Sequence, residues 1–189
     1  MKLFNAVILA GGQSSRMGAD KSTLVLGDET LLERAIRIAK NAGAQSVYVS
    51  RASDADTDIR DDFPDCGPLG GIHAALKHDA SLPMLIIPVD LPLLDSASLN
   101  SLVENAYESK STSHFKRQFV PILIWQPELL IDALEERLKG GENLSLRAFF
   151  NNCAKIEVEL SNPLALENAN TLEEWQAILK QATRLPVQE

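Results

Sequence analysis

The sequence contains few of the residues that mark several classes of protein. Only two of its 189 residues are cysteine, three are histidine and 5% are aromatic. Cys66 and Cys153 lie far apart, without a C-x-x-C spacing or a histidine cluster beside them. We therefore expect reduced thiols, and neither a disulfide framework nor a zinc site. No apolar run approaches the roughly 20 residues that a membrane-spanning helix needs.

Positive charge is scarce as well. The chain has 18 Lys and Arg residues against 26 Asp and Glu residues, which gives a net charge of −8. Nucleic acids and anionic membranes attract basic surfaces, so this balance argues against both as partners. The N-terminal sequence MKLF leads almost directly into a glycine-rich stretch and leaves no room for a cleavable signal. We therefore expect a cytoplasmic protein.

The rest of the composition is that of an ordinary globular protein, with 45% hydrophobic and 23% charged residues. A chain of this length is expected to form one domain, residues 1–189, with a core large enough to be stable alone. The informative features are therefore local motifs rather than composition.

The N-terminal stretch NAVILAGGQSSRMGADK has the form of a phosphate-binding loop. Its first five residues are mostly apolar and predict a strand buried on both faces of a mainly parallel sheet. Gly11 and Gly12 follow at once and, lacking side chains, let phosphate oxygens approach main-chain N–H groups. Arg16 offers a planar fork to phosphate, and Lys21 offers a compact positive charge. We interpret the stretch as a triphosphate site, with a solvated strand-to-helix turn as the alternative.

The spacing within this stretch excludes the two commonest glycine-rich nucleotide loops. The dinucleotide fingerprint requires G-x-G-x-x-G, which the sequence GGQSSR does not supply. The Walker loop requires Gly followed directly by Lys and Ser or Thr, whereas Ala19 and Asp20 separate Gly18 from Lys21. Any phosphate cradle here is of another kind.

The residues after the loop predict a βαβ unit. Apolar residues at helical spacing over residues 31–39 indicate a helix that ends near Gly43, and residues 46–50 indicate the next strand. Such a crossover is right-handed, and its repetition along the chain favours an α/β sandwich. Ligands in these folds bind beyond the carboxyl ends of the strands, where the glycine loop and Ser50 lie.

Two further motifs carry candidate site residues. In the stretch DDFPDCGPLGG, residues 61–71, small residues would let main-chain groups approach a planar base; the alternative is a Pro-Gly turn that caps a helix. In PVDLP, residues 88–92, Asp90 ends an apolar strand, where one carboxylate suits Mg²⁺ together with phosphate oxygens. The alternative is that Asp90 caps the helix expected to start near residues 95–96.

The remaining stretches predict structure more than function. Residues 52–65 and 108–118 are polar and predict connectors, with a short strand or none before Pro121. His73 is expected to be a surface or satisfied residue rather than a catalyst. Lys116 and Arg117 predict a solvated basic pair, with a contact to an acceptor phosphate as the alternative.

The pattern Leu-Ala-Gly-Gly-x-Ser-x-Arg-Met-Gly-x-Asp-Lys, from Leu9 to Lys21, resembles the signature of the molybdenum cofactor guanylyltransferases. This family is a branch of the nucleotide-diphospho-sugar transferase-like superfamily. The resemblance implies an α/β fold, a three-layer sandwich with a mostly parallel, Rossmann-like sheet. It is also dense over residues 67–71, 88–92 and 168–174, although Leu172 replaces the usual proline of the last motif.

The resemblance also implies roles for single residues. The catalytic residues would be Arg16, Lys21 and Asp90, with Asp90 as the Mg²⁺ ligand. Asn168 and Asn170 would border the active site, while Thr171 and Glu174 fit a capping box for the last helix. Asp61 matches a nucleotide-contacting aspartate, with neighbouring Asp62 as the alternative by one position. The implied nucleotide contacts are Leu9, Ala10, Gly11, Gly12, Lys21, Ser50, Asp61, Gly67, Pro68, Leu69, Gly71 and Asp90.

The implied reaction is transfer of GMP from GTP to molybdenum-carrying molybdopterin, which forms the guanine dinucleotide cofactor and pyrophosphate. The elements that meet the acceptor would lie mainly within residues 100–165. Cofactor-delivery proteins or target apoenzymes would be transient partners. Two alternatives stay open: a cytidylyltransferase acting on the same pterin or another small phosphorylated acceptor, and a non-catalytic nucleotide-binding module.

Overall fold

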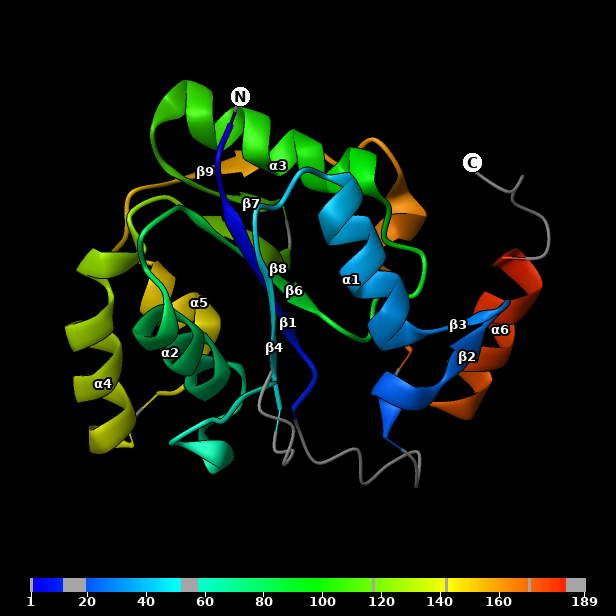
Figure 1. The fold of residues 1–189 in the computed structure, drawn as a ribbon, viewed down its shortest axis with the longest axis horizontal. Coiled ribbons are helices and arrows are strands. Elements are labelled where there is room, and N and C mark those ends of the chain that lie inside the picture. The colour runs from blue at the N-terminus through cyan, green and yellow to red at the C-terminus, as the bar shows by residue number, and fades with distance from the viewer. Residues whose placement is uncertain are drawn as a thin grey trace.

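The computed structural model describes residues 2–11, 20–51, 58–116, 118–141, 143–169 and 171–182 (Figure 1). Its centre is a seven-stranded sheet with the strand order β5-β4-β1-β6-β8-β7-β9. The pairs β5-β4, β4-β1, β1-β6 and β7-β9 are parallel, and β8 runs antiparallel to both its neighbours. The strands are β1 (Asn5–Leu9), β4 (Val47–Ser50), β5 (Asp58–Ile59), β6 (Met84–Pro88), β7 (Thr112–Phe115), β8 (Gln118–Ile124) and β9 (Lys155–Val158).

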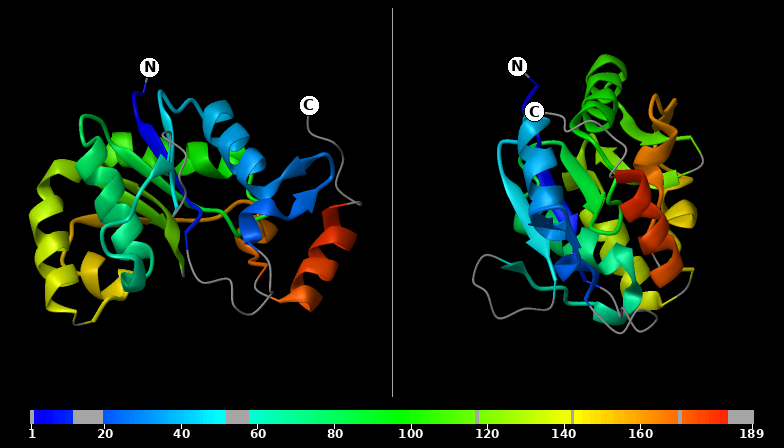
Figure 2. Two further views of the ribbon diagram at one scale, coloured as in Figure 1. Left: turned by 60° about the horizontal axis from the view of Figure 1, so that its bottom comes forward. Right: turned by 90° about the vertical axis from the view of Figure 1, so that its right-hand side faces the viewer.

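Helices cover both faces of the sheet, as Figure 1 and the two views of Figure 2 show. One face packs against α1 (Leu31–Asn41) and α3 (Ser96–Ser109), and the other against α2 (Pro68–His78), α4 (Ile131–Gly140) and α5 (Leu146–Phe150). α6 (Leu172–Ala182) joins the core on the side of α1 and α3 but lies beside the sheet rather than over it (Figure 1). This arrangement confirms the predicted three-layer α/β sandwich with a mostly parallel sheet. The smaller elements are the hairpin β2 (Val25–Leu26) and β3 (Glu29–Thr30) and the 3₁₀ helices η1 (Lys21–Thr23), η2 (Pro64–Cys66), η3 (Pro127–Leu129) and η4 (Pro163–Leu166).

The central strand β1 is buried on both faces, as its unbroken apolar sequence predicts. Ala6, Val7 and Ile8 have no exposed surface. Because successive side chains of a strand point to opposite faces, Ala6 and Ile8 join the core under α1 and α3, and Val7 joins the core under α2. Burying a side chain the size of Val or Ile contributes about 1.5–3 kcal/mol, so β1 is a rigid base for the loop that follows it.

Side-chain caps fix where the helices begin. Thr30 and Glu33 form a reciprocal capping box at the start of α1. Asp95 caps α3, where its carboxylate accepts a hydrogen bond of 2.7 Å from the Ser98 N–H. The cap of α3 is therefore Asp95, and the alternative that Asp90 serves as this cap is wrong.

The prediction of a connector over residues 108–118 is wrong for most of that stretch. α3 extends to Ser109, and β7 forms an inner strand whose four residues are all buried. Its hydroxyl groups are satisfied, because Ser113 Oγ donates to Leu102 O at 2.8 Å and Thr112 Oγ1 accepts from the Trp125 N–H at 3.2 Å. β8 then begins at Gln118 and runs through Pro121 to Ile124, so the strand before this proline is present and short, as one of the two expectations had it. Polar residues that bond to the backbone inside the fold resemble a loop when only the sequence is considered.

Two smaller findings complete the fold. Within residues 52–65, expected to be a connector, Asp58–Ile59 pairs with β4 as the strand β5, and Pro64–Cys66 forms η2. Among the described residues, none of the helices combines the length and the apolar character that crossing a membrane requires.

Candidate active site

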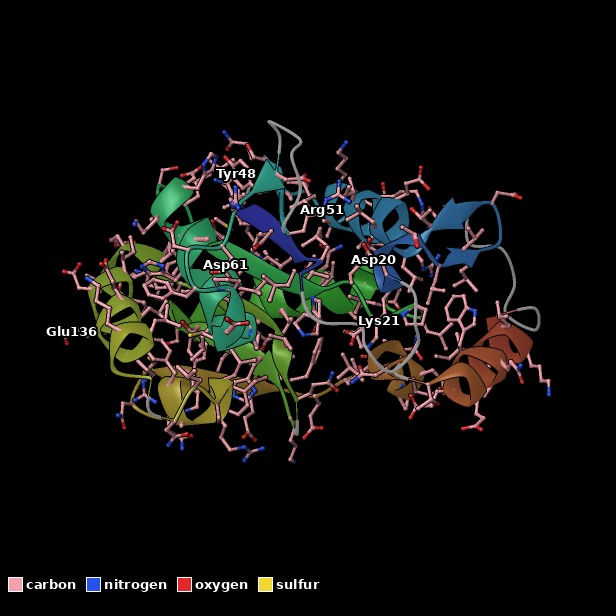
Figure 3. All side chains as sticks on the ribbon, turned by 90° about the horizontal axis from the view of Figure 1, so that it is seen from below. Asp20, Lys21, Tyr48, Arg51, Asp61 and Glu136 are labelled. Carbon is pink, nitrogen blue, oxygen red and sulfur yellow. The ribbon has the colours of Figure 1, made fainter. Side chains whose placement is uncertain are left out.

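Three neighbouring strands end together at one edge of the sheet. In the register of β4, β1 and β6, Ser50 lies beside Leu9 and Leu9 lies beside Pro88. The pairing continues one residue further, since the Ala10 N–H donates to Ser50 O at 2.9 Å and the Val89 N–H donates to Leu9 O at 3.1 Å. This is the edge at which open α/β sheets bind ligands. Figure 3 looks at the molecule from this side.

Lys21 and Asp90 meet at this edge. Lys21 Nζ lies 3.3 Å from Asp90 Oδ2, and the two side chains are 18% and 26% exposed. Lys21 begins η1, which Asp20 caps by accepting a hydrogen bond of 2.9 Å from the Ser22 N–H. Residues 69 positions apart are thus brought together as the motifs predict. Because desolvation offsets most of the attraction in such a half-buried pair, the contact adds little net stability.

The loop that carries Asp90 is held on three sides. The Ala169 N–H donates to Asp90 O at 3.2 Å, and Val89 is bonded to the end of β1 as described. Arg34 of α1 donates from Nε to Pro92 O at 2.6 Å. The same Arg34 also pairs with Glu29 at 3.1 Å. Asp90 therefore has a fixed place at the edge, set by the neighbouring strand, by α1 and by the segment before α6.

Glu29 anchors Arg34 from the hairpin. It also pairs with Arg37 at 2.6 Å, and the hydrogen bond from Arg37 lowers the pKa of Glu29. Sequence reasoning did not single out Arg34, since 58 positions separate it from Pro92 and no local pattern links the two.

The segment after η4 also reaches this edge. Asn168 is exposed and directly precedes Ala169, whose N–H is bonded to Asp90 O. Asn170 lies outside the described residues. The predicted capping box is present, with Thr171 Oγ1 accepting from the Glu174 N–H at 3.1 Å and Glu174 Oε2 accepting from the Thr171 N–H at 3.0 Å. The motif therefore has a structural role in addition to its place beside Asp90.

The start of α2 is packed closely against the strand ends. A Cβ atom on Gly71 would lie 2.9 Å from Ser50 Oγ and 3.1 Å from Leu9 Cδ2. A Cβ atom on Gly70 would lie 2.5 Å from both Asp61 Oδ2 and Phe63 O, closer than such atoms can approach. These glycines are therefore needed for α2 to sit against the loop that carries Asp61. The helix begins at Pro68.

Of the two neighbouring aspartates, Asp61 packs against Gly70 at the start of α2. Its carboxylate accepts a hydrogen bond of 2.7 Å from the Phe63 N–H, and burial raises the pKa of Asp61. Asp62 is exposed and pairs with Lys77 at 3.5 Å. Asp61 therefore stays the predicted nucleotide contact, with Asp62 as the alternative.

The other predicted nucleotide contacts differ in whether their side chains or only their main chains are accessible to a ligand. Gly67 and Pro68 are exposed, and Gly67 has a φ of +63°, a conformation that favours glycine. The Leu69 side chain is fully buried in the core, so it can stabilise α2 while only its main chain could meet a ligand. A Cβ atom on Gly11 would lie 3.7 Å from Arg51 Cα, which is ordinary contact. Gly12 and Arg16 lie outside the described residues.

The expectation that His73 is a surface or satisfied residue is wrong. The side chain has no exposed surface, and both ring nitrogens are buried without a hydrogen-bond partner among the described residues. Phe63 meets the ring edge-on at a centroid distance of 5.4 Å, and Glu135 Oε2 lies 3.8 Å from Nε2. Burial lowers the pKa of His73, so the neutral ring is favoured.

The arrangement of the sheet and its helices is similar to that of known structures. Molybdopterin-guanine dinucleotide biosynthesis protein A from Archaeoglobus fulgidus superposes with a TM-score of 0.78 and 18% identity over 96% of this chain and 100% of the other. 2-C-methyl-D-erythritol 4-phosphate cytidylyltransferase from Thermus thermophilus gives a TM-score of 0.70 with 15% identity, over 97% and 100% of the two chains. The chain therefore shares the α/β fold of these two proteins.

Sequence comparison defines the family. The chain belongs to the MobA-like NTP transferases, because the model of that domain family matches residues 6–156. A molybdenum cofactor guanylyltransferase from Xanthomonas euvesicatoria is 34% identical over 180 residues, which are 93% of this chain and 94% of that protein. Another from Photobacterium profundum is 31% identical over 182 residues, 90% and 92% of the two chains. The protein is thus a nucleotidyltransferase.

Proposed function

We propose that this protein transfers GMP from GTP to the phosphate of molybdenum-carrying molybdopterin, forming the guanine dinucleotide cofactor and pyrophosphate. The observation that carries the proposal is the 3.3 Å contact of Lys21 with Asp90 at the carboxyl edge of β1 and β6. The guanylyltransferase names of the relatives supply the choice of base and acceptor. The cytidylyltransferase from Thermus thermophilus is only 15% identical to this chain, so its likeness shows the fold and does not support transfer from CTP.

The reaction needs little covalent chemistry from the protein. An oxygen of the acceptor phosphate attacks the α-phosphorus of GTP, the bond from that phosphorus to the bridging β-phosphate oxygen breaks, and pyrophosphate leaves with the electron pair. The attacking phosphate is already anionic near neutral pH, so no general base is required. The acceleration then comes from positioning and from neutralising charge. In this proposal Lys21 and Arg16 stabilise the departing pyrophosphate, and the main-chain N–H groups of Gly11 and Gly12 orient it.

The residues present also suit a magnesium ion at Asp90. Mg²⁺ prefers oxygen ligands and commonly takes one or two carboxylates, with substrate phosphates and water completing its shell. Among the described residues there is no group of three or more His, Cys, Asp or Glu side chains that could hold a metal. A single carboxylate at the end of a strand is enough for a Mg²⁺ ion whose other ligands are substrate phosphates and water. When bound there, Mg²⁺ would neutralise charge on the reacting phosphates.

The remaining site residues have supporting roles in the proposal. The carboxylate of Asp61 and the main chain from Gly67 to Gly71 would contact the base and ribose. Ser50 lies against Gly71 and beside the end of β1, where its hydroxyl could bond to the nucleotide. Asn168 borders Asp90, and Asn170 is its predicted companion.

A nucleotide panel tests this function. The protein is incubated with Mg²⁺, molybdopterin and α-labelled GTP, CTP or ATP, and labelled dinucleotide is separated from free nucleotide. The proposal expects transfer from GTP at a rate well above that from CTP, and stronger protection from thermal unfolding by GTP than by CTP. Preferred transfer from CTP would instead identify a cytidylyltransferase. Nucleotide binding without transfer to any acceptor would identify a non-catalytic module.

A further inference from the structure

A pocket of about 510 Å³ lies on the other half of the sheet, away from the nucleotide loops. Its lining comes from β7, β8, β9 and α5, which no sequence motif connects. His114 and Phe119 line it from the sheet, and Arg147, Lys155 and Glu157 line it from α5 and β9. The pocket therefore combines a buried aromatic floor with charged groups around it.

The floor contains an unsatisfied polar atom. His114 is 2% exposed, and its Nδ1 lies 2.8 Å from Phe115 O. A carbonyl oxygen can only accept, so Nδ1 is the donor in this contact, and in the tautomer whose single proton is on Nδ1 the other nitrogen, Nε2, is an acceptor. Nε2 is buried and has no hydrogen-bond partner among the described residues. An unpaired buried acceptor lowers the stability of the folded protein. A ligand that donates a hydrogen bond to Nε2 would therefore gain binding free energy in this pocket.

The walls offer a flat apolar face and opposite charges. The Phe119 ring stacks on His114 at a centroid distance of 4.5 Å and an angle of 13°, and the Arg147 guanidinium lies 5.4 Å from the centroid of the Phe119 ring. Lys155 donates to Asn151 O at 3.4 Å. Within the described ranges neither Arg147 nor Lys155 forms an ion pair with a carboxylate.

Glu157 adds one carboxylate to this lining. A ligand that fits must therefore be planar and must present donors to Glu157 and His114 and an acceptor to the cations.

The pocket is within reach of the reaction edge. β8 runs antiparallel to β6, so its first residues, including Phe119, lie at the edge where β6 ends. β7 ends at the same edge, because Phe115 pairs with Gln118. Neighbouring strands lie about 4.8 Å apart, which places β7 about 10 Å from β6 along this edge. The pocket also faces the layer of α2, α4 and α5, against whose core Phe119 packs.

We propose that this pocket binds the pterin ring of the acceptor while the acceptor's phosphate lies at Asp90, an assignment that rests on the proposed function. A pterin carries an aminopyrimidinone ring, whose amino and ring N–H groups donate to Glu157 and His114 Nε2 and whose carbonyl oxygen accepts from Arg147 or Lys155. Its flat face takes the place of the Arg147 guanidinium over one face of the Phe119 ring, while the other face stays stacked on His114. Guanine presents the same hydrogen-bonding edge as a pterin. The loops proposed to bind the nucleotide, however, lie at β4, β1 and α2, so we assign this pocket to the pterin.

Direct binding of a free pteridine tests the pocket without requiring activity. The full-length protein, without nucleotide, is titrated with 2-amino-4-oxopteridine, and binding is followed by the ligand's fluorescence. The control ligand 2,4-dioxopteridine lacks the amino group. We expect the amino compound to bind about tenfold more tightly, because a hydrogen bond to a charged group is lost in the control. Equal binding of the two ligands, or binding of neither, would overturn the assignment.

Substitutions of pocket residues test whether the pteridine binds in this pocket. Glu157→Gln should remove most of the preference for the amino compound, whereas Glu136→Gln, an exposed carboxylate on α4 (Figure 3), should leave it unchanged. In the transfer assay Arg147→Gln should raise the KM for molybdopterin about tenfold with the KM for GTP unchanged, and Arg147→Lys should restore part of it. Lys40→Gln, on α1, controls for the change in net charge.

The outcomes separate this assignment from the proposed function. If the wild type transfers GMP but the Glu157 and Arg147 variants behave as the wild type does, the pocket assignment is wrong and the function stands. If the wild type transfers no GMP to molybdopterin, the proposed function is wrong, whatever the pteridine titration shows.

Discussion

The two halves of the sheet differ in how they are built and in how the sequence encodes them. Strands β5, β4, β1 and β6 are all parallel, and their site residues come from short motifs at the strand ends. In the half formed by β8, β7 and β9, one antiparallel strand lies beside a parallel pair, and the pocket residues are scattered from His114 to Glu157. In the two proposals made above, the first half holds the nucleotide and the second half holds the acceptor.

The largest expected effect is on the transfer rate and comes from Asp90, which follows β6, where the two halves of the sheet meet. Asp90→Asn should lower the rate of GMP transfer about 100- to 1,000-fold, because it removes the charge proposed to hold Mg²⁺ and the reacting phosphates. The fold should survive, since Asp90 is partly exposed and its main chain carries the bonds that fix the loop. Steady-state transfer and circular dichroism check both statements. Asp28→Asn, an exposed carboxylate in the turn between β2 and β3, is the control; full magnesium-dependent turnover in Asp90→Asn would refute the assignment.

A second substitution tests the packing of the nucleotide half. Gly70→Ala should destabilise the protein by about 1–3 kcal/mol and raise the KM for GTP, because the new methyl group would meet Asp61 and the Phe63 backbone at 2.5 Å. Gly140→Ala, at the end of α4, has nothing within 4 Å of the new atom and should be neutral or slightly stabilising. Denaturant unfolding and GTP kinetics compare the two. Equal effects on both measures would show that the contact of α2 with Asp61 is unimportant.

A matched pair of arginines on α1 tests the support of Asp90. Both Arg34 and Arg37 pair with Glu29, but only Arg34 donates to Pro92 O. Arg34→Gln should therefore lower kcat about tenfold by loosening the Asp90 loop, while Arg37→Gln should change kcat little. Raising the Mg²⁺ concentration should restore part of the lost rate in Arg34→Gln. If both variants lose activity equally, the effect belongs to Glu29 and not to the Asp90 loop.

The smallest expected effect is the pH dependence of stability. Burial lowers the pKa of His73 in the folded protein, whereas in the unfolded chain histidine titrates near pH 6.5. The unfolded state therefore takes up a proton that the folded state does not, and this contribution to stability is lost as the pH falls below about 6.5 toward the lower folded pKa. His73→Leu should show a smaller fall in Tm between about pH 7 and pH 5 than the wild type.

The exposed His78 of α2 provides the control for this measurement. His78→Leu removes a histidine from the same helix without opening the packing around His73. Asp61, whose pKa is raised, is present in all three proteins, so the difference between them isolates His73. An unchanged slope in His73→Leu would show that the histidine titrates alike in both states.

The sequence predicted the nucleotide half well because its determinants are local. An apolar run buried on both faces predicts β1, and a carboxylate placed after another such run predicts where Asp90 lies. Their roles in the reaction stay predictions. In the other half, β7 was missed because Thr112, Ser113 and His114 are polar residues satisfied inside the fold, a pattern that a loop shares.

The pocket and the support of Asp90 could not be predicted for a related reason. Phe119 and Arg147 lie on different elements, and so do Arg34 and Pro92, so each contact exists only after the layers have packed. Likewise, the burial of His73 follows from the packing of Phe63 and α4 around it, which periodicity along α2 alone does not define.

A double-mutant cycle on Lys21 and Asp90 tests the central claim most directly. The measured quantity is kcat/KM for GMP transfer from α-labelled GTP to molybdopterin in the wild type, Lys21→Gln, Asp90→Asn and the double variant. If the two side chains act on the same set of phosphates, each single change is severe and the double variant is little worse than Asp90→Asn alone. Full activity in either single variant, or losses that simply multiply in the double variant, would contradict a shared reaction centre at this edge.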